Sequence, residues 1–271
     1  MTEDAVIRKL RRQSPLIGDD CAVVPGPPGQ DFLFTADLSI EGVHFTRDLS
    51  AEQIGRRAVA RSLSDIAAMG GKPLYCLISL ALAPWTDARW IDGFYRGLSE
   101  ILRQTKTKLA GGDLSHAQQL VCDVTLCGVV ARGKALLRSG AKVGDALYVS
   151  GPLGGWRHQP EIAPRLDFAR KLIGKANSCM DISDGLALDL HRLCLASRVS
   201  AQIDSVPLLP GATIEQALHD GEDYELVFTA PAARRVSGIR IGTITKGKAG
   251  ALRYRGKSLA PTGYDHLQHR S

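Results

Sequence analysis

The sequence lacks the short motifs by which many enzymes are recognised. It contains neither a G-x-x-x-x-G-K-[ST] loop nor a G-x-G-x-x-G pattern, the two glycine-rich signatures of nucleotide phosphate binding. It also has no H-E-x-x-H, no cysteine and histidine zinc spacing and no G-x-S-x-G. These absences argue against a zinc enzyme or a serine hydrolase, and they require any bound nucleotide to be held mainly by metal ions and loops.

Long apolar runs and paired cysteines are also missing. The longest apolar stretch, residues 74–85, is too short for a helix that crosses a bilayer, and the first residues lack the apolar core of a signal peptide. The six cysteines form no C-x-x-C pair, and most lie in apolar segments, which is typical of structural thiols in a reducing cytosol. We therefore expect a cytoplasmic protein with no membrane partner.

Basic residues are in excess but are dispersed along the chain. The 271 residues include 34 Lys and Arg against 28 Asp and Glu, a formal net charge of +6. The densest basic group, Arg8 to Arg12, has no aromatic residues interleaved with it, so the pattern disfavours a nucleic-acid partner. A phosphorylated metabolite is the expected partner instead.

Strand-like and helix-like segments are mixed throughout the chain. Apolar periodicity predicts helices over 50–70, 87–104, 161–174 and 186–196, and strands over 31–37, 74–83, 119–131, 145–150, 199–204, 223–229 and 239–245. Ser50 and Gln53 have capping-box spacing at the start of the first helix. Because residues 131–145 are rich in glycine and lysine, they suit an interdomain connection. The prediction is a mixed α/β (α+β) protein with domains at 1–135 and 136–271.

Acidic residues gather in five short clusters beside glycine, serine or small apolar residues. The clusters are Gly18-Asp19-Asp20, Asp37 with Glu41, Ser64-Asp65, Gly112-Asp113, and Asp181-Ile182-Ser183-Asp184. Carboxylates beside residues that let the backbone come close are what hard cations and phosphate groups require. Each cluster taken singly also has an ordinary explanation as a turn, a helix cap or a solvated loop. Together they predict a metal-dependent phosphate enzyme.

Asp65 is the most informative of these acids. It falls in the last two turns of the predicted helix, where the helix dipole disfavours an anion, and the residues after it are apolar. A carboxylate in such a place needs a cation or several hydrogen-bond donors, and Ser62 or Ser64 is the structural alternative. His44 suits a phosphate or an aromatic substrate, although it also fits an ordinary loop histidine.

Nine segments, taken in order, resemble the thiamine-monophosphate kinase family. They are IGDDCAVV (17–24), TADLSIEGVHF (35–45), SLSDIAAMGGKP (62–73), GGD (111–113), LLRSGAKVGDALYVSG (136–151), MDISDGLALDL (180–190), GEDYELVFT (221–229), IG-x-I (241–244) and GYDH (263–266). They span nearly the whole chain in the family's order. The combination of DISDGL with GEDYEL is highly specific, whereas the short G-D-D and G-G-D pieces are not.

The resemblance implies the fold of the aminoimidazole ribonucleotide synthetase superfamily, with an N-terminal sheet domain that forms a homodimer and a C-terminal α/β domain. It implies a Mg²⁺-dependent kinase that transfers the γ-phosphoryl group of ATP to thiamine monophosphate, giving thiamine diphosphate and ADP. The implied metal ligands are Asp20, Thr35, Asp37, Asp65, Asp113, Asp181 and Asp184, of which Asp37, Asp65 and Asp113 are also the implied catalytic residues. The implied ATP contacts are Gly112, Asp113, Arg138 and Ser183, and the implied substrate contacts are His44 and Glu222.

Three departures from the family pattern concern substrate and metal binding. Ala36 stands where the family usually has threonine, Pro261 stands in place of a substrate-stacking aromatic residue, and the segment between Gly155 and Asp181 is short. Two alternatives stay open at this point: another enzyme of the superfamily, or a protein that binds nucleotide or thiamine phosphate without turnover. A selenophosphate synthetase is disfavoured, because residues 1–17 contain no cysteine.

Overall fold

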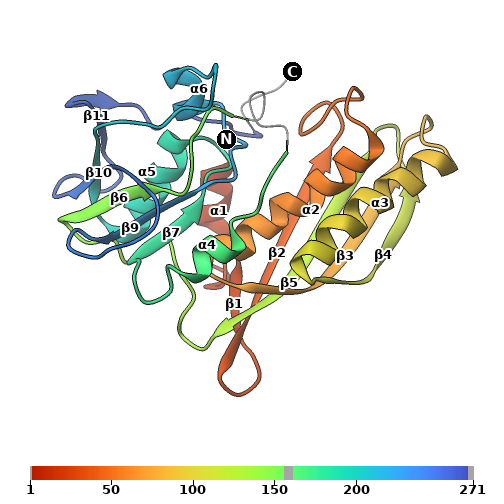
Figure 1. Ribbon diagram of the computed structural model, residues 1–271, viewed down its shortest axis with the longest axis horizontal. Helices are drawn as coiled ribbons and strands as arrows, with labels where there is room; N and C mark the ends of the chain where they lie inside the picture. Colours follow the sequence, from red (N-terminus) through yellow and green to blue (C-terminus); the bar gives the residue numbers. More distant parts are fainter. Residues whose placement is uncertain (1, 156–160, 268–271) are drawn as a thin grey trace.

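Two β-sheets form the two halves of the molecule, which lie side by side along its long axis (Figure 1). This computed structural model describes residues 2–155 and 161–267. One sheet has five strands and the other has seven. The expected mixed α/β class, with one sheet in each half of the chain, is thereby confirmed.

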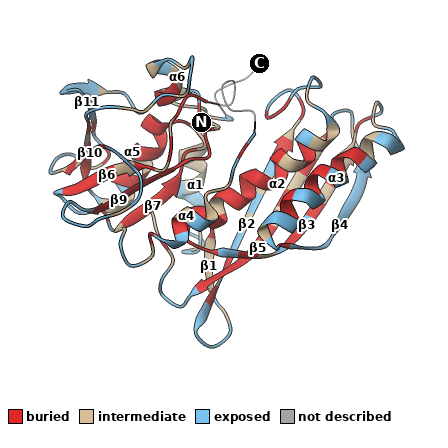
Figure 2. Ribbon diagram, viewed as in Figure 1, coloured by how far each residue is buried: buried red, intermediate tan, exposed pale blue. Residues whose placement is uncertain are grey.

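The N-terminal half is a sheet with helices on one face. Its elements are α1 (Glu3–Arg11), β1 (Ala22–Pro25), β2 (Gln30–Ile40), α2 (Ala51–Ala68), β3 (Lys72–Leu82), α3 (Ala88–Thr105), β4 (Lys108–His116) and β5 (Val121–Ala131). The strand order is β1-β2-β5-β3-β4, and α2 and α3 cover the face where apolar side chains of alternating strand residues are buried (Figure 2). Within the described part of the chain, no helix covers the other face (Figure 1).

The C-terminal half follows the connection between β5 and β6. Its elements are β6 (Asp145–Val149), α4 (Leu166–Arg170), β7 (Ser178–Asp181), α5 (Leu186–Ser197), β8 (Ser200–Ile203), α6 (Ile214–His219), β9 (Leu226–Pro231), β10 (Ile239–Thr245), β11 (Leu252–Tyr254) and β12 (Lys257–Leu259). The strand order is β12-β11-β8-β10-β6-β9-β7. Because β7 is the edge strand, it lies next to α2 of the first half, and the two elements are in contact.

Helix α2 joins the two halves. Its N-terminus is fixed by the predicted capping box, in which Ser50 Oγ accepts from Gln53 N at 3.2 Å and Gln53 Oε1 accepts from Ser50 N at 2.8 Å. Its other end packs on the second half, since Ala67 and Ala68 share an apolar cluster with Phe228 and neighbouring residues of that half. The exact boundary between 135 and 136 stays a prediction.

The structure shifts several predicted elements. Strand β2 extends to Ile40, so Asp37 lies inside the strand rather than at its end. Gly112 and Asp113 lie inside β4, although no predicted strand includes them. The helix expected over 161–174 is only α4, and the strand expected from 223 begins at Leu226. This last shift has a local cause, because Glu222 and Tyr224 have φ of 57° and 51°, which a strand does not allow.

The remaining two expectations concern membranes and cysteines. Within the described ranges, no helix combines the length and apolar character needed to cross a membrane. All six cysteines are free thiols, and five of them are buried. Their role is therefore packing, as the sequence indicates.

Candidate active site

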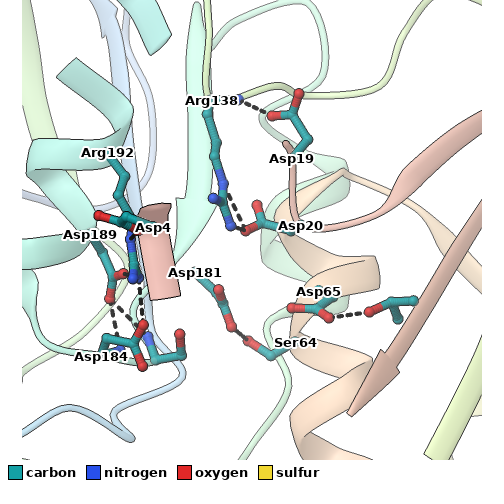
Figure 3. Close-up of polar contacts among 12 residues, drawn as sticks. Asp4, Asp19, Asp20, Ser64, Asp65, Arg138, Asp181, Asp184, Asp189 and Arg192 are labelled. Carbon is teal, nitrogen blue, oxygen red and sulfur yellow. Dashed lines mark hydrogen bonds and ion pairs between the residues drawn. The ribbon is translucent and has the colours of Figure 1, made fainter. Parts of the chain in front are cut away.

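Three of the predicted acids converge at the junction of the two halves. Asp20 precedes β1, Asp65 lies in the last turns of α2, and Asp181 ends β7. Each offers a carboxylate oxygen within 4.8 Å of the other two (Figure 3). We call these three residues, with the nearby Asp37 of β2, the acidic centre.

Hydrogen bonds fix the orientation of three carboxylates in the acidic centre, those of Asp20, Asp65 and Asp181. Thr35 Oγ1 of β2 donates to Asp65, and Ser64 Oγ of α2 donates to Asp181 at 2.8 Å. Arg138 Nε donates to Asp20 at 3.2 Å, and its Nη2 donates to the same oxygen (Figure 3). Ser64 is thus a partner of the acid across the junction rather than of its neighbour Asp65.

The acidic centre holds more negative charge than its protein partners offset. Burial raises the pKa of Asp65 well above its usual range, and repulsion from Asp37 and Asp181 adds to the effect. Burial and then Asp20 raise the pKa of Asp181 in the same way. The Oδ2 atoms of Asp20 and Asp37 are buried and have no hydrogen-bond partner among the residues that the structure describes. The atoms that could coordinate a metal here are oxygens of closely spaced carboxylates. Because hard divalent cations prefer such oxygen ligands, the residues fit a hard divalent cation.

A cavity of about 210 Å³ opens from the acidic centre. Asp37, Asp65 and Asp181 of the acidic centre are part of its lining. A second group of lining residues, here called the acceptor end, consists of aromatic rings, carboxylates and one arginine: His44, Tyr264, His266, Glu3, Glu222 and Arg61. One cavity thus joins the acids to an aromatic wall, as an enzyme for a ring-bearing phosphate requires.

His44 is a neutral hydrogen-bond donor in this wall. Its Nδ1 accepts from Ile40 N at 3.0 Å, so the proton of the neutral ring is on Nε2. Burial, followed by the charge of Arg61, lowers the pKa of His44 to about 3. The ring centroid of His266 lies 5.1 Å from that of His44 and 4.7 Å from that of Tyr264. Pro261, where the resemblance implies an aromatic residue, is exposed and outside this wall.

The GEDYEL segment ties the second half to the cavity. Glu222 accepts from Arg57 Nη2 at 2.8 Å, and the Tyr224 hydroxyl accepts from Arg61 Nε at 2.6 Å. Asp223 accepts from the N–H groups of both Gly154 and its neighbour at 2.8 Å. The left-handed backbone of Glu222 and Tyr224 points both side chains at α2. Sequence reasoning missed the two arginines, although their i, i+4 spacing in an apolar helix was a signal.

Asp184 and Ser183 lie beside the acidic centre rather than in it. Arg192 Nη1 of α5 donates to Asp184 and, at 3.0 Å, to Asp189 (Figure 3). Asp189 Oδ2 in turn accepts from Ser183 N at 3.0 Å and Asp184 N at 2.9 Å. Both residues still line the cavity. The structure thus shows Asp184 in an ion pair, with Arg192 and Asp189 as partners that the motif did not reveal.

Gly112 and Asp113 are not brought to the acidic centre by this chain. Asp37 pairs with Val124 of β5, which pairs with Ile78 of β3, which pairs with Gly112 of β4. These three strand spacings amount to about 14 Å. Asp113 is one residue further and therefore faces the other side of the sheet from Asp37. Ala36 also faces that outer side, away from the acidic centre.

The comparisons with known proteins assign the fold and site to a class. Residues 18–130 match the family model for the N-terminal domain of AIR synthase related proteins. The chain is 35% identical to a thiamine-monophosphate kinase of Haemophilus influenzae, over 79% of this chain and 75% of that protein. It is 32% identical to the Aquifex aeolicus enzyme of the same name, over 96% of this chain and 95% of that protein.

A structural comparison agrees with these sequence matches. A solved structure of AaThiL complexed with AMPPCP and TMP has a TM-score of 0.91 and 31% identity, covering 98% of this chain and 97% of that one. The chain belongs to the thiamine-monophosphate kinase family.

Proposed function

We propose that this enzyme phosphorylates thiamine monophosphate with ATP, and that the acidic centre is where the transfer takes place. The convergence of Asp20, Asp65 and Asp181 from separate elements, within 4.8 Å, is the observation that carries this assignment. The reaction brings together two anionic phosphates, so the site must first offset their repulsion.

The residues of the acidic centre would hold Mg²⁺ through their carboxylate oxygens. When bound, Mg²⁺ offsets the charge of the phosphate oxygens and stabilises the in-line transition state. The chain's own contribution is positioning. Thr35 and Ser64 orient two of the carboxylates, and His44 presents a neutral N–H at the acceptor end. The acceptor is already an anion, so no strong general base is needed and a direct transfer is the proposed route.

The nucleotide side of the site is a second cavity, whose lining carries four arginines and three acids. Its volume is about 440 Å³, and Arg8, Arg11, Arg138 and Ser183 line it. Arg138 also contacts Asp20, so this cavity reaches the acidic centre. Guanidinium groups bind phosphate oxygens through paired N–H donors, and this supports Arg138 and Ser183 as contacts of the ATP phosphates.

A homodimer would account for Asp113. Four apolar side chains are 41% to 50% exposed on the outer face of the five-stranded sheet: Phe34, Leu38, Tyr75 and Leu77. In addition, two strand edges have no strand partner among the described residues. They are the free edge of β4 and, on the side of β2 that faces β1, residues 35–40. We propose that a second copy packs on this face and that the partner subunit's Asp113 approaches the acidic centre. A Leu77→Asp variant should then be monomeric in sedimentation and lose activity.

The domain assignment follows from the same picture. Residues 1–135 would form the domain that supplies Asp20, Asp37 and Asp65 and the dimer surface. Residues 136–271 would form the domain that supplies Asp181 and completes both cavities. Such a division explains why the site lies where α2 meets β7.

One assay tests the proposed reaction. Purified protein with ATP, Mg²⁺ and thiamine monophosphate should form thiamine diphosphate and ADP in equal amounts, and EDTA should stop the reaction until excess Mg²⁺ is restored. If product formed at the same rate in EDTA, the metal assignment would be wrong. If ADP formed without thiamine diphosphate, the acceptor would be wrong.

A further inference from the structure

Arg61 is a buried arginine at the acceptor end of the cavity, and no role has been assigned to it. It is 8% exposed and extends from α2. Beyond the bond from Nε to Tyr224, its Nη1 donates to the Leu38 carbonyl at 2.8 Å and to the Ser39 hydroxyl at 3.1 Å. Its Nη2 has no hydrogen-bond partner in the part of the chain that the structure describes. One edge of the guanidinium is thus fixed, and the other is unused.

The charge of Arg61 also lacks a direct counter-ion. Arg57, one helical turn earlier, forms an ion pair with Glu222 at 2.8 Å. No described carboxylate makes such a pair with Arg61. Burial disfavours its charge, but Tyr224, Asp37 and Glu222 together raise its pKa, so it stays ionised. A buried guanidinium with an unused edge on a cavity calls for an anion there.

The neighbours of Arg61 indicate which part of a ligand this anion is. Asp37 of the acidic centre and His44 of the aromatic wall line the same cavity as Arg61, and the charge of Arg61 interacts with both. A ligand with a planar ring against the wall and a phosphate toward the acids would place that phosphate beside Arg61. Thiamine monophosphate has this shape: a two-carbon chain joins its phosphate to the cationic thiazolium ring, and the pyrimidine ring lies beyond that ring.

We propose that Arg61 binds the phosphate of the acceptor through its Nη2 edge, and that Tyr224 and β2 hold the guanidinium in the plane this contact needs. The inference rests on the proposed function and goes beyond it by naming a residue that distinguishes phosphorylated from unphosphorylated thiamine. Because Arg61 is held by three protein acceptors, its guanidinium is pre-organised, and little side-chain entropy is lost on binding.

Paired titrations test this inference. Thiamine monophosphate and thiamine are each titrated calorimetrically into the wild type, Arg61→Gln and Arg56→Gln in Mg²⁺ without ATP. Losing a hydrogen bond between charged groups should weaken thiamine monophosphate binding by about 30-fold. Thiamine binding should change by less than about 3-fold, because it has no phosphate to lose. Arg56 is the matched control: it lies on the same helix, contacts Gln104 outside the cavity, and should change neither affinity.

The outcomes separate a phosphate contact from a structural role. An equal loss of affinity for both ligands in Arg61→Gln would show that Arg61 only supports the fold, and unchanged affinity for both would exclude the contact. If Arg61→Gln does not fold, Arg61→Lys takes its place, because it retains the charge. Arg61→Lys should keep part of the preference for thiamine monophosphate over thiamine. Equal affinity of Arg61→Lys for the two ligands would overturn the inference. If the wild type binds thiamine monophosphate but makes no product, the proposed reaction fails while the same titrations still decide the contact.

Discussion

Two clusters of acids lie side by side in this enzyme, and their arginine partners distinguish them (Figure 3). In the acidic centre, the Arg138 guanidinium hydrogen-bonds only to Asp20, and two buried carboxylate oxygens have no partner among the described residues. In the second cluster, which we call the Arg192 cluster, one guanidinium contacts all three acids: Asp4, Asp184 and Asp189.

This difference distinguishes a site that binds a ligand from a cluster of acids that only stabilises the fold. Two N–H groups and one arginine already satisfy the acids of the Arg192 cluster, so that cluster needs nothing from outside. The acidic centre remains under-compensated in the protein alone, and that is the state a cation would relieve. The DISDGL stretch contributes Asp181 to the acidic centre and Asp184 to the Arg192 cluster, so sequence proximity does not predict which acid belongs where.

The largest expected effect is on turnover when the acidic centre is altered. Asp65→Asn should lower kcat by at least about 1,000-fold, because a metal-binding carboxylate is lost from the transfer site. It should not destabilise the metal-free fold, since it removes a buried charge that Asp37 and Asp181 repel. Phosphoryl-transfer rates and thermal melting in EDTA measure the two effects. A variant with near-normal kcat would remove Asp65 from the site.

In the Arg192 cluster, by contrast, a substitution should lower the stability of the fold. Arg192→Met leaves the buried Asp189 without its ion pair, which should lower the free energy of unfolding by about 3 kcal/mol. Chemical denaturation of the wild type and the variant measures this difference. An unfolding free energy within error of the wild type would show that the three acids are satisfied without Arg192, and the contrast between the clusters would lose its basis.

Asp223 is intermediate between the two clusters, because only one of its two carboxylate oxygens has hydrogen-bond partners. Its substitution has the smallest expected effect on stability. Its Oδ1 accepts two N–H groups, while its Oδ2 is buried without a partner, and burial raises its pKa to about 7. Between pH 4 and pH 7 the folded state binds this proton and the unfolded state does not, so this group's contribution to stability falls as pH rises. Asp223→Asn removes the effect and keeps the acceptor.

The measurement for Asp223 is a pair of melting curves at two pH values. Relative to the wild type, Asp223→Asn should gain at least about 1 kcal/mol between pH 5 and pH 8, the value of roughly one pKa unit. A difference between the two proteins that does not change with pH would mean that Asp223 titrates normally in the fold.

Periodicity and capping predicted much of the fold, and they failed where tertiary contacts decide. Helix α2 was predicted closely because Ser50 and the apolar face act locally. Strand β9 was predicted to begin at residue 223 but begins at Leu226, because Tyr224 has a left-handed backbone that its residue type does not predict. The Tyr224 hydroxyl contacts Arg61, a partner distant in the sequence. No predicted strand included Asp113 either, whereas pairing with β3 makes it part of an edge strand.

The candidate site shows the same limit. The individual acids were visible in the sequence, but their grouping depends on α2 meeting β7, which no local pattern encodes. The resemblance supplied that grouping for Asp20, Asp65 and Asp181. It did not supply Arg57 and Arg61, which are recognised only once their partners in the GEDYEL segment are seen.

The central claim is that the acidic centre, and not the Arg192 cluster, binds the divalent cation. Crystals soaked with Mn²⁺ and a non-hydrolysable ATP analogue test it most directly, through the anomalous difference map. The account predicts strong peaks within coordination distance of Asp20, Asp65 and Asp181. Peaks confined to Asp184 and Asp189, or none between the two halves, would contradict it.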